Sequence, residues 1–228
     1  LGWDSIDVLL ISGDTYLDTS YNGSALVGKW LVEHGFKVGI IAQPEVDVPD
    51  DITRLGEPNL FFAISGGCVD SMVANYTATK KRRQQDDFTP GGENNKRPDR
   101  AVLVYSNMIR RFFKGTTKKI VISGIESSLR RITHYDYWTN KLRKPILFDA
   151  KADILSYGMG EMSMLQLANA LKNGEDWQNI RGLCYLSKEP KEDYLSLPSH
   201  SDCLADKDKF IEAFHTFYLN CDPITAKG

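Results

Sequence analysis

The residues best suited to chemistry in this chain follow short apolar runs, where glycine, serine and acidic side chains recur. The segments are "SGDTYLD" (12–18), "AQPEVD" (42–47), "SGGCVDS" (65–71), "SGIESSLRR" (123–131) and "YGMGE" (157–161). Glycine lets a ligand approach the backbone closely, and acidic side chains can hold a metal ion or a ribose. No GxGxxG or Walker A sequence is present, so the chain has neither a dinucleotide fingerprint nor a P-loop.

These segments supply the candidate cofactor-binding residues. They are Gly13, Asp14, Ser65, Gly66, Gly67, Gly124, Glu126, Gly158, Gly160 and Glu161. A further acid, Asp18, shares a loop with Asp14. Acids that stabilise loops are commoner than acids that bind ligands, and a glycine pair is commonly a tight turn. A structural role therefore stays open for each candidate.

The stretch "SGIESSLRRITHYDYW" (123–138) combines arginines with large aromatic residues. Arginines could bind phosphates there, with the aromatic rings as stacking platforms for bases. Interleaved acids and the net charge of −2 argue against that alternative, which is not favoured. We interpret the stretch as a domain-docking segment made of Arg130, Arg131, His134, Tyr135, Tyr137 and Trp138.

No catalytic centre and no metal site is predicted in this chain. The four histidines form no HxH or HExxH motif and no Ser/His/Asp grouping. The cysteines, Cys68, Cys184, Cys203 and Cys221, form no CxxC pair, so free thiols in a cytoplasmic protein are expected. No apolar run approaches the roughly 18 residues that span a bilayer, so no membrane partner is expected.

The elements that must position these residues alternate between buried strands and helices. Five apolar runs favour strands: "IDVLLIS", "KVGIIAQP", "NLFFAIS", "KKIVISG" and "ADILSYG". "SALVGKWLVEHG" and "EMSMLQLANALKNG" have helical spacing and end in glycine. "RAVLVYSNMIRRFF" fits strand or helix, and we favour helix. This βαβ pattern predicts a parallel sheet whose candidate residues gather at its carboxyl edge.

Two regions lie outside this pattern. The polar insertion at 77–100 is predicted to be the end of a helix and a solvated loop, with a functional role as the alternative. After the fifth strand, "IRGLCYLS" and "DYLSLP" suggest a strand pair at the edge of the sheet. "DKDKFIEAFHTFYLNC" then predicts an amphipathic helix that packs on the domain or on whatever follows. We predict a domain over 1–187 and an extension over 188–228, in a fragment of a longer protein.

Several long motifs resemble one known family. "GWDSIDVLLISGDTYLD", "TPGGENNKRPDRA", "GIESSLRRITHYDYW" and "FDAKADILSYGMGE" are similar to the N-terminal part of the YgiQ family of radical S-adenosylmethionine proteins. The resemblance implies an α/β, flavodoxin-like fold similar to cobalamin-binding domains. This is a three-layer sandwich around a five-stranded, mostly parallel sheet of order 2-1-3-4-5, followed by a C-terminal hairpin and helix.

The same resemblance implies the activity of the full-length protein. It would bind a [4Fe–4S] cluster and S-adenosylmethionine, and would generate a deoxyadenosyl radical that acts on an unknown substrate. The CxxxCxxC cluster motif is absent here and lies downstream in the family, so this chain is not expected to be catalytic alone. Its expected partner is a C-terminal radical S-adenosylmethionine domain of the same polypeptide, whose active site it would cover or shape.

Alternative functions stay open from the sequence. The DxHxxG motif of many cobalamin domains is missing from the loop "GDTYLDTSYNG", so cobalamin binding is open but not favoured. A stand-alone cobalamin or nucleotide binder is one alternative to the radical-enzyme domain. An RNA-recognition module of a modification enzyme is the other.

Overall fold

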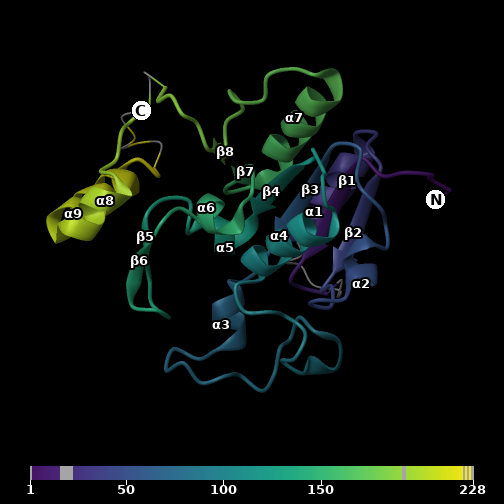
Figure 1. Ribbon diagram of the computed structural model, residues 1–228, viewed down its shortest axis with the longest axis horizontal. Helices are drawn as coiled ribbons and strands as arrows, with labels where there is room; N and C mark the ends of the chain where they lie inside the picture. The colour runs from purple at the N-terminus through teal and green to yellow at the C-terminus, as the bar shows by residue number, and fades with distance from the viewer. Residues whose placement is uncertain (1, 16–22, 192–193, 223, 225, 227–228) are drawn as a thin grey trace.

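The computed structural model describes residues 2–15, 23–191, 194–222, 224 and 226, and Asp18 lies outside them. Its core is a six-stranded sheet of order β2-β1-β3-β4-β7-β8 (Figure 1). The strands are β1 (Val8–Ser12), β2 (Val38–Ala42), β3 (Phe61–Ser65), β4 (Lys119–Ser123), β7 (Ile154–Ser156) and β8 (Leu183–Tyr185). The first five pair in parallel, which confirms both the predicted strands and the order 2-1-3-4-5.

Alternating side chains of β1, which has a neighbouring strand on each side, point to opposite faces of the sheet. In β1, Val8 and Leu10 belong to one buried apolar cluster, and Leu9 and Ile11 belong to the other. All four side chains are at most 4 % exposed. A strand covered on both faces therefore reads as a continuous apolar run.

Helices cover both faces and make three layers (Figure 1). On one face lie α1 (Gly23–Glu33) and α7 (Gly160–Asn173), and on the other lie α2 (Pro49–Thr53), α4 (Ala101–Phe112) and α6 (Ile146–Ala150). The ambiguous segment is helix α4, as favoured, with Tyr105 and Ile109 fully buried. α7 ends at Gly174, whose left-handed conformation (φ 69°) fits a C-terminal cap.

The 77–100 insertion is mainly an exposed loop that follows the end of a helix, as predicted, but several of its polar residues are buried. It includes the single turn η1 (Pro90–Gly92) and two isolated bridges, Tyr76 to Arg82 and Gln85 to Glu93. Four of its polar residues are at least 92 % buried: Asp86, Thr89, Asn94 and Arg97. Figure 1 shows it as the long loop beside α3 (Ser71–Asn75). It is bonded to the end of β1, where the Thr15 N–H donates to the Phe88 carbonyl at 3.0 Å.

The C-terminal part differs from the expected hairpin and single helix. β8 pairs antiparallel with β7, but residues 194–198, the described part of the expected second strand, form no strand. The hairpin lies earlier, in β5 (His134–Asp136) and β6 (Lys141–Arg143). Two helices follow, α8 (His200–Ala205) and α9 (Lys207–Leu219), separated at Asp206. Both helices lie beyond β5 and β6, away from the six-stranded sheet (Figure 1). The domain boundary between residues 187 and 188 stays a prediction.

None of the helices in the described part of the chain is long and apolar enough to cross a membrane.

Candidate functional site

Three parallel strands end in serine at the same level of the sheet. Ser12 pairs with Ser65 across β1 and β3, and Ser65 pairs with Ser123 across β3 and β4. Ser12 Oγ accepts the Asp14 N–H at 3.1 Å, Ser65 Oγ accepts the Gly67 N–H at 3.2 Å, and Ser123 Oγ donates to the Ile64 carbonyl of β3 at 3.3 Å. This serine row marks the carboxyl edge of the sheet, where ligands bind in open α/β folds.

Two adjoining hollows lie at this edge, and together we call them the strand-exit cleft. One, of about 100 Å³, lies between the sheet and the helices α1 and α7, with Val27 and Met164 on its helical side. The other, of about 250 Å³, reaches Cys68. Six of the ten predicted binding residues line the cleft: Asp14, Ser65, Gly67, Gly124, Gly158 and Gly160. The other four do not: Gly13, Gly66, Glu126 and Glu161.

At the ends of β1 and β3, the glycines make room for the protein itself. A Cβ on Gly13 would lie 2.1 Å from the Gly66 carbonyl oxygen, and one on Gly66 would lie 2.4 Å from Glu126 Oε2. One on Gly67, whose φ is +115°, would lie 2.2 Å from Asp14 Oδ1. These contacts are closer than real side chains permit. The glycines here are therefore explained by internal packing, without a ligand.

A buried arginine from the insertion neutralises the acid at the end of β1. Arg97 Nη2 lies 2.7 Å from Asp14 Oδ1 and 3.2 Å from Asp86 Oδ1, and the Arg97 side chain is fully buried. The Thr89 hydroxyl donates to Asp86 at 2.7 Å, and the Gln43 amide donates to Thr89 at 2.7 Å. Removing Arg97 would leave two buried carboxylates without a cation, and removing both acids would leave a buried guanidinium without an anion. The insertion thus completes the structure of the β1 exit.

Burial shifts the pKa values of Asp14 and Cys68, which lie at the corner formed by the ends of β1 and β3. Desolvation raises the pKa of Asp14 despite the opposing charge of Arg97 and the N–H of Cys68, which donates at 2.6 Å. Burial, together with the Asp14 charge, raises the pKa of the Cys68 thiol to about 12. Cys68 is therefore a protonated thiol at neutral pH and not an activated nucleophile.

Glu126 joins the first turns of two helices. It lies in the short helix α5 (Gly124–Ser128), where only a loop was expected, and is 2 % exposed. Its Oε2 accepts the Ser71 N–H at 3.0 Å and its Oε1 accepts the Val102 N–H at 3.2 Å. Burial raises the pKa of Glu126, and the nearby Asp70 charge adds to this. Both oxygens serve helix N-termini, which matches the structural alternative for this acid.

The end of β7 is open in a way that the ends of β1 and β3 are not. A Cβ on Gly158 would meet nothing within 4 Å, and one on Gly160 would make only ordinary contacts, at 3.7 Å or more. Met159, between them, is 85 % exposed. Glu161 lies in the first turn of α7 and is half-buried. The β7 exit is thus the part of the cleft where the backbone remains approachable.

The two arginines of the predicted docking segment are used within the chain. Arg130 forms an ion pair with Asp70 and donates to the Glu126 carbonyl at 2.9 Å. The Arg131 guanidinium lies over two rings, 4.8 Å from that of Tyr157 and 4.3 Å from that of Phe217. Arg131 therefore connects the end of β7 with α9.

Two aromatic residues of the segment contact the insertion. The Trp138 ring lies 5.1 Å from that of Tyr76, and the Tyr137 hydroxyl donates to the Ala78 carbonyl at 2.8 Å. Lys80 lies over the Tyr137 ring at 4.6 Å. Rings engaged in this way are poor candidates for stacking on bases. The structure thus gives the nucleic-acid alternative no added support.

The remaining residues of the segment are held by the β5–β6 hairpin. The Tyr135 hydroxyl donates to Asn140 at 2.6 Å, and burial lowers the pKa of His134, whose Nδ1 lies 3.1 Å from a carbonyl. Asp136 is buried, yet hydrogen bonds and the charges of Arg100 and Arg143 hold its pKa well below its usual range. Docking of this segment onto another domain stays a prediction.

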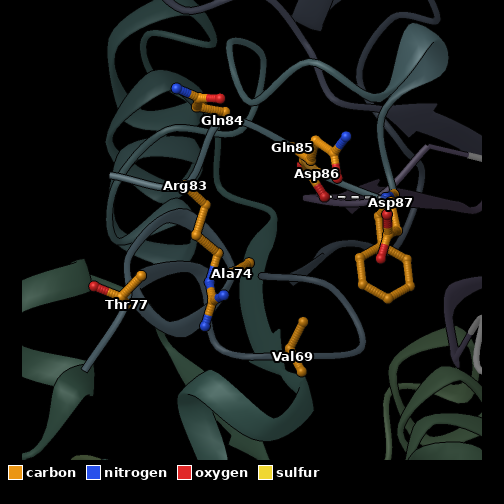
Figure 2. A pocket seen from close by; sticks show the side chains of 9 residues that line it. Val69, Ala74, Thr77, Arg83, Gln84, Gln85, Asp86 and Asp87 are labelled. Atoms are coloured by element: carbon orange, nitrogen blue, oxygen red, sulfur yellow. Dashed lines mark hydrogen bonds between the residues drawn. The ribbon is translucent and has the colours of Figure 1, made fainter. Parts of the chain in front are cut away.

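A second hollow, of about 660 Å³, opens beside α3. Figure 2 shows Val69, Ala74 and Thr77 on one side of it and Gln85 and Asp86 of the insertion on another. One of its two acids is already engaged: Asp86 accepts the Phe88 N–H at 3.0 Å and forms an ion pair with Arg97. Arg83 is likewise bonded to backbone carbonyls. Two of the charged side chains that line the hollow are thus used within the chain.

The described residues contain no group of three or more histidine, cysteine or acidic side chains that could hold a metal ion. The four cysteines are free thiols and lie on different elements. This chain therefore does not offer the cluster of thiolates that an iron–sulfur centre needs.

The family model described as Radical SAM N-terminal matches residues 1–228. The chain belongs to this family. The membership confirms the resemblance to radical S-adenosylmethionine proteins that the motifs indicated.

Relatives of this radical SAM N-terminal chain are considerably longer than it is. It is 96 % identical to a UPF0313 protein of Fusobacterium nucleatum, covering 100 % of this chain and 40 % of that protein. A UPF0313 protein of Thermotoga neapolitana is 49 % identical over 98 % of this chain and 40 % of its own length. A UPF0313 protein of Methanocaldococcus jannaschii is 48 % identical over 98 % of this chain and 38 % of its own length. The chain thus spans about two fifths of the relatives it matches.

Solved structures share the fold. The chain resembles the radical S-adenosylmethionine methyltransferase TsrM from Kitasatospora setae, solved with its tryptophan substrate and the S-adenosylmethionine analogue aza-SAM, with a TM-score of 0.53. The identity is 16 %, over 81 % of this chain and 29 % of that one. A second TsrM structure, with cobalamin and a [4Fe–4S] cluster bound, gives a TM-score of 0.53 at 18 % identity. The match covers 81 % of this chain and 28 % of that one. This likeness confirms the flavodoxin-like fold expected of such domains.

Several residues of the site were not predicted. Arg97, Asp86 and Gln43 complete the β1 exit, and Val27 and Met164 form the helical wall of the cleft. The repeated Ser-Gly after apolar runs was a usable signal for the serine row. No comparable signal marks Arg97, because an arginine in a polar insertion is ordinarily exposed.

Proposed function

We propose that this chain is the N-terminal domain of a radical S-adenosylmethionine enzyme, and that its strand-exit edge covers or shapes the substrate site of a barrel domain in the same polypeptide. The observation that carries the proposal is the strand-exit cleft, with its approachable backbone at the end of β7. Ligand sites of open α/β folds occupy this edge. Family membership and the greater length of the relatives support a second domain.

The [4Fe–4S] cluster and S-adenosylmethionine would be held outside this chain. Cluster binding needs several thiolates together, and the cysteines here lie on separate elements. This chain would contribute one surface of the substrate site. Gly158 and Gly160 present bare backbone, while Val27 and Met164 present apolar surface that excludes water from whatever lies against it. Excluding water protects reactive intermediates from side reactions.

The test uses the full-length protein, prepared without oxygen. We expect about four irons per chain and a change in the paramagnetic resonance of the reduced cluster when S-adenosylmethionine is added. Gly160→Leu would fill the cleft, and we expect it to change the rate of 5′-deoxyadenosine release several-fold at an unchanged iron content. Gln166→Leu, at an exposed position of α7, is the matched control. A full-length protein without a cluster, or equal rates in both variants, would contradict the proposal.

A second candidate is cobalamin binding, favoured by the hollow between the sheet and α1/α7 together with the shared fold of a cobalamin-containing enzyme. Val27, Met164 and Gly160 could contact part of such a group, and the cofactor would supply a cobalt centre for methyl transfer. No histidine occurs in the loop after β1, so no residue of that loop would ligate the cobalt. We therefore rank this candidate second.

Cobalamin binding is tested by the absorbance of the full-length protein after incubation with hydroxocobalamin and desalting. Retention that is lost in Gly160→Leu and kept in Gln166→Leu would support binding in the cleft. No retention at tens of micromolar cobalamin would exclude this candidate and leave the first one standing.

A further inference from the structure

The helix α9 has an apolar stripe that the described part of the chain leaves uncovered. Ile211, Phe214 and Tyr218 recur at helical spacing, and their exposed fractions are 60 %, 59 % and 65 %. The rings of Phe214 and Tyr218 stack with centroids 6.3 Å apart. Single exposed apolar residues are ordinary, whereas a contiguous set on one helix face is typical of an interaction surface.

The neighbouring face of the same helix is already packed. Ala213 is 3 % exposed, and the Phe217 ring carries the Arg131 guanidinium at 4.3 Å. The preceding helix is held as well, because Thr133 Oγ1 lies 3.3 Å from His200 Nδ1 and Cys203 is 2 % exposed. α9 is therefore fixed on the domain by one face, and its stripe is presented at a defined place. Of the two alternatives that the sequence left open, packing on this domain accounts for one face of the helix but not for this stripe.

The charges beside the stripe do not suit a lipid surface. A helix that binds membranes carries mainly lysine and arginine on its polar face. In α9, acids and bases alternate, and Lys209 forms an ion pair with Glu212 at 2.7 Å. The stripe thus fits an apolar protein surface of no strong charge.

We propose that the Ile211–Phe214–Tyr218 stripe is the surface on which the downstream domain of the same polypeptide packs. This rests on the proposed function, which places a second domain in that polypeptide. Matched relatives are about two and a half times as long as this chain, of which it spans 40 %. A domain tethered close to α9 meets the stripe at high effective concentration, which favours it over a separate partner.

The proposal also connects the docked domain to the cleft. Arg131 lies between the ring of Phe217 on α9 and the ring of Tyr157, which directly precedes the open glycine Gly158. A domain that packs on the stripe is thereby positioned relative to the end of β7. This places the stripe as an anchor and the strand-exit cleft as the surface that the anchored domain faces.

The experiment is photo-crosslinking in the full-length protein, with Tyr218 replaced by p-benzoyl-phenylalanine. We expect cross-links within one polypeptide, from residue 218 to peptides that follow residue 228, identified by mass spectrometry. The same probe at Leu55, which is 41 % exposed and lies away from the strand exits, is the control and should give none of these peptides. Cross-links that double the mass on a denaturing gel would show a second copy on the stripe. Such a result, or no protein cross-link at all, would overturn the proposal.

A second measurement does not depend on the probe. In the full-length protein, Phe214→Ser with Tyr218→Ser should speed the backbone hydrogen exchange of residues 207–219 by about tenfold or more, because the covering domain is lost. Leu55→Ser should leave that exchange unchanged. Equal exchange in all three proteins would overturn the proposal. A protein that lacks a cluster but still cross-links would contradict the proposed function alone, so the two failures are distinguishable.

Discussion

The strand-exit edge has a closed half, after β1 and β3, and an open half, after β7. Glycines follow the strands in both halves, but they have different structural roles. After β1 and β3, the glycines pack against backbone and buried carboxylates, so that no side chain fits at those positions. After β7, a Cβ on Gly158 would meet nothing within 4 Å, and one on Gly160 would make only ordinary contacts. A glycine that follows a buried strand therefore does not by itself indicate a ligand site. What separates the two cases is whether another segment of the chain already occupies the space.

The closed half owes its structure to a segment far away in the sequence. Arg97 of the insertion lies between Asp14 and Asp86, and Glu126 of α5 bonds the N-termini of α3 and α4. Among the residues that the structure describes, no comparable contact meets a Cβ placed on Gly158 in the open half. The comparison therefore predicts that changes in the closed half act on stability, whereas changes in the open half act on whatever the cleft contacts.

The largest effect is expected from Arg97→Met in the closed half. The variant would leave two buried carboxylates, Asp14 and Asp86, side by side without a cation, which should lower the free energy of unfolding by about 3–5 kcal/mol. Chemical denaturation of the full-length protein measures it. Arg111→Met is the matched control, because Arg111 is 62 % exposed and its ion pair with Asp47 should contribute at most about 1 kcal/mol.

A rescue variant sharpens the interpretation. Changing Asp14 and Asp86 to asparagine together with Arg97→Met removes all three charges, and should recover most of the lost stability. If Arg97→Met behaved like Arg111→Met, the closed half would not depend on this buried triad.

The contrast between the halves is tested directly by adding one methyl group to each. Gly13→Ala places a Cβ 2.1 Å from the Gly66 carbonyl oxygen, so backbone must move, at a cost of about 1–3 kcal/mol. Gly160→Ala makes only contacts of 3.7 Å or more, and should change stability by no more than about 0.5 kcal/mol. Thermal unfolding of the two variants side by side provides the measurement. Equal losses would remove the distinction between a closed and an open half.

Much of the fold could be predicted because its signals are local. Each parallel strand is a short apolar run because both faces of the sheet are covered. In β1, for example, Val8 packs in one buried cluster and Leu9 in the other. α4 was predicted as a helix, even though "AVLVY" alone suits a strand, because its apolar residues follow helical spacing over the whole segment. The short elements α5, β5 and β6 have too few residues to show any period.

The site was less predictable because its contacts are long-range. Glu126 could be singled out as an acid at a strand exit, but its partners at Ser71 and Val102 lie 55 and 24 residues away. Arg97 sits in a polar insertion whose composition is typical of an exposed loop, and only the tertiary structure shows that it is buried. Residue type thus located the edge of the sheet, but could not separate its open half from its closed one.

A smaller effect, with a pH signature, is expected from Glu126→Gln. The amide offers one acceptor where the carboxylate offers two, so one buried N–H of Ser71 or Val102 loses its partner, at about 1–2 kcal/mol. Because burial raises the pKa of Glu126 above its ordinary 4.5, the folded state holds a proton that the unfolded state has released. Wild-type stability therefore falls as the pH rises from about 4.5 through that raised pKa, and this contribution is missing in the variant.

Denaturation at a series of pH values measures this prediction as the difference between the two proteins. The gap in unfolding free energy should narrow as the pH rises, since only the wild type loses the contribution. Asp14, whose pKa is also raised, titrates in both proteins and cancels in the difference. A gap that is constant across the range would contradict the assignment of a raised pKa to Glu126.

The smallest effect concerns reactivity rather than stability, and it probes the closed half from within. With a thiol pKa of about 12 against an ordinary 9.0, Cys68 carries roughly a thousandfold less thiolate than a free cysteine at pH 8. We expect iodoacetamide to modify exposed Cys221 about thirtyfold faster or more, because the greater nucleophilicity of the more basic Cys68 thiolate offsets part of that difference. Asp14→Asn removes a charge that opposes the thiolate but leaves the burial, which is the larger cause, so it should speed Cys68 modification only several-fold. Peptide mass spectrometry gives both rates, and a Cys68 as reactive as Cys221 would mean that the β1–β3 corner opens to solvent as readily as the β7 exit does.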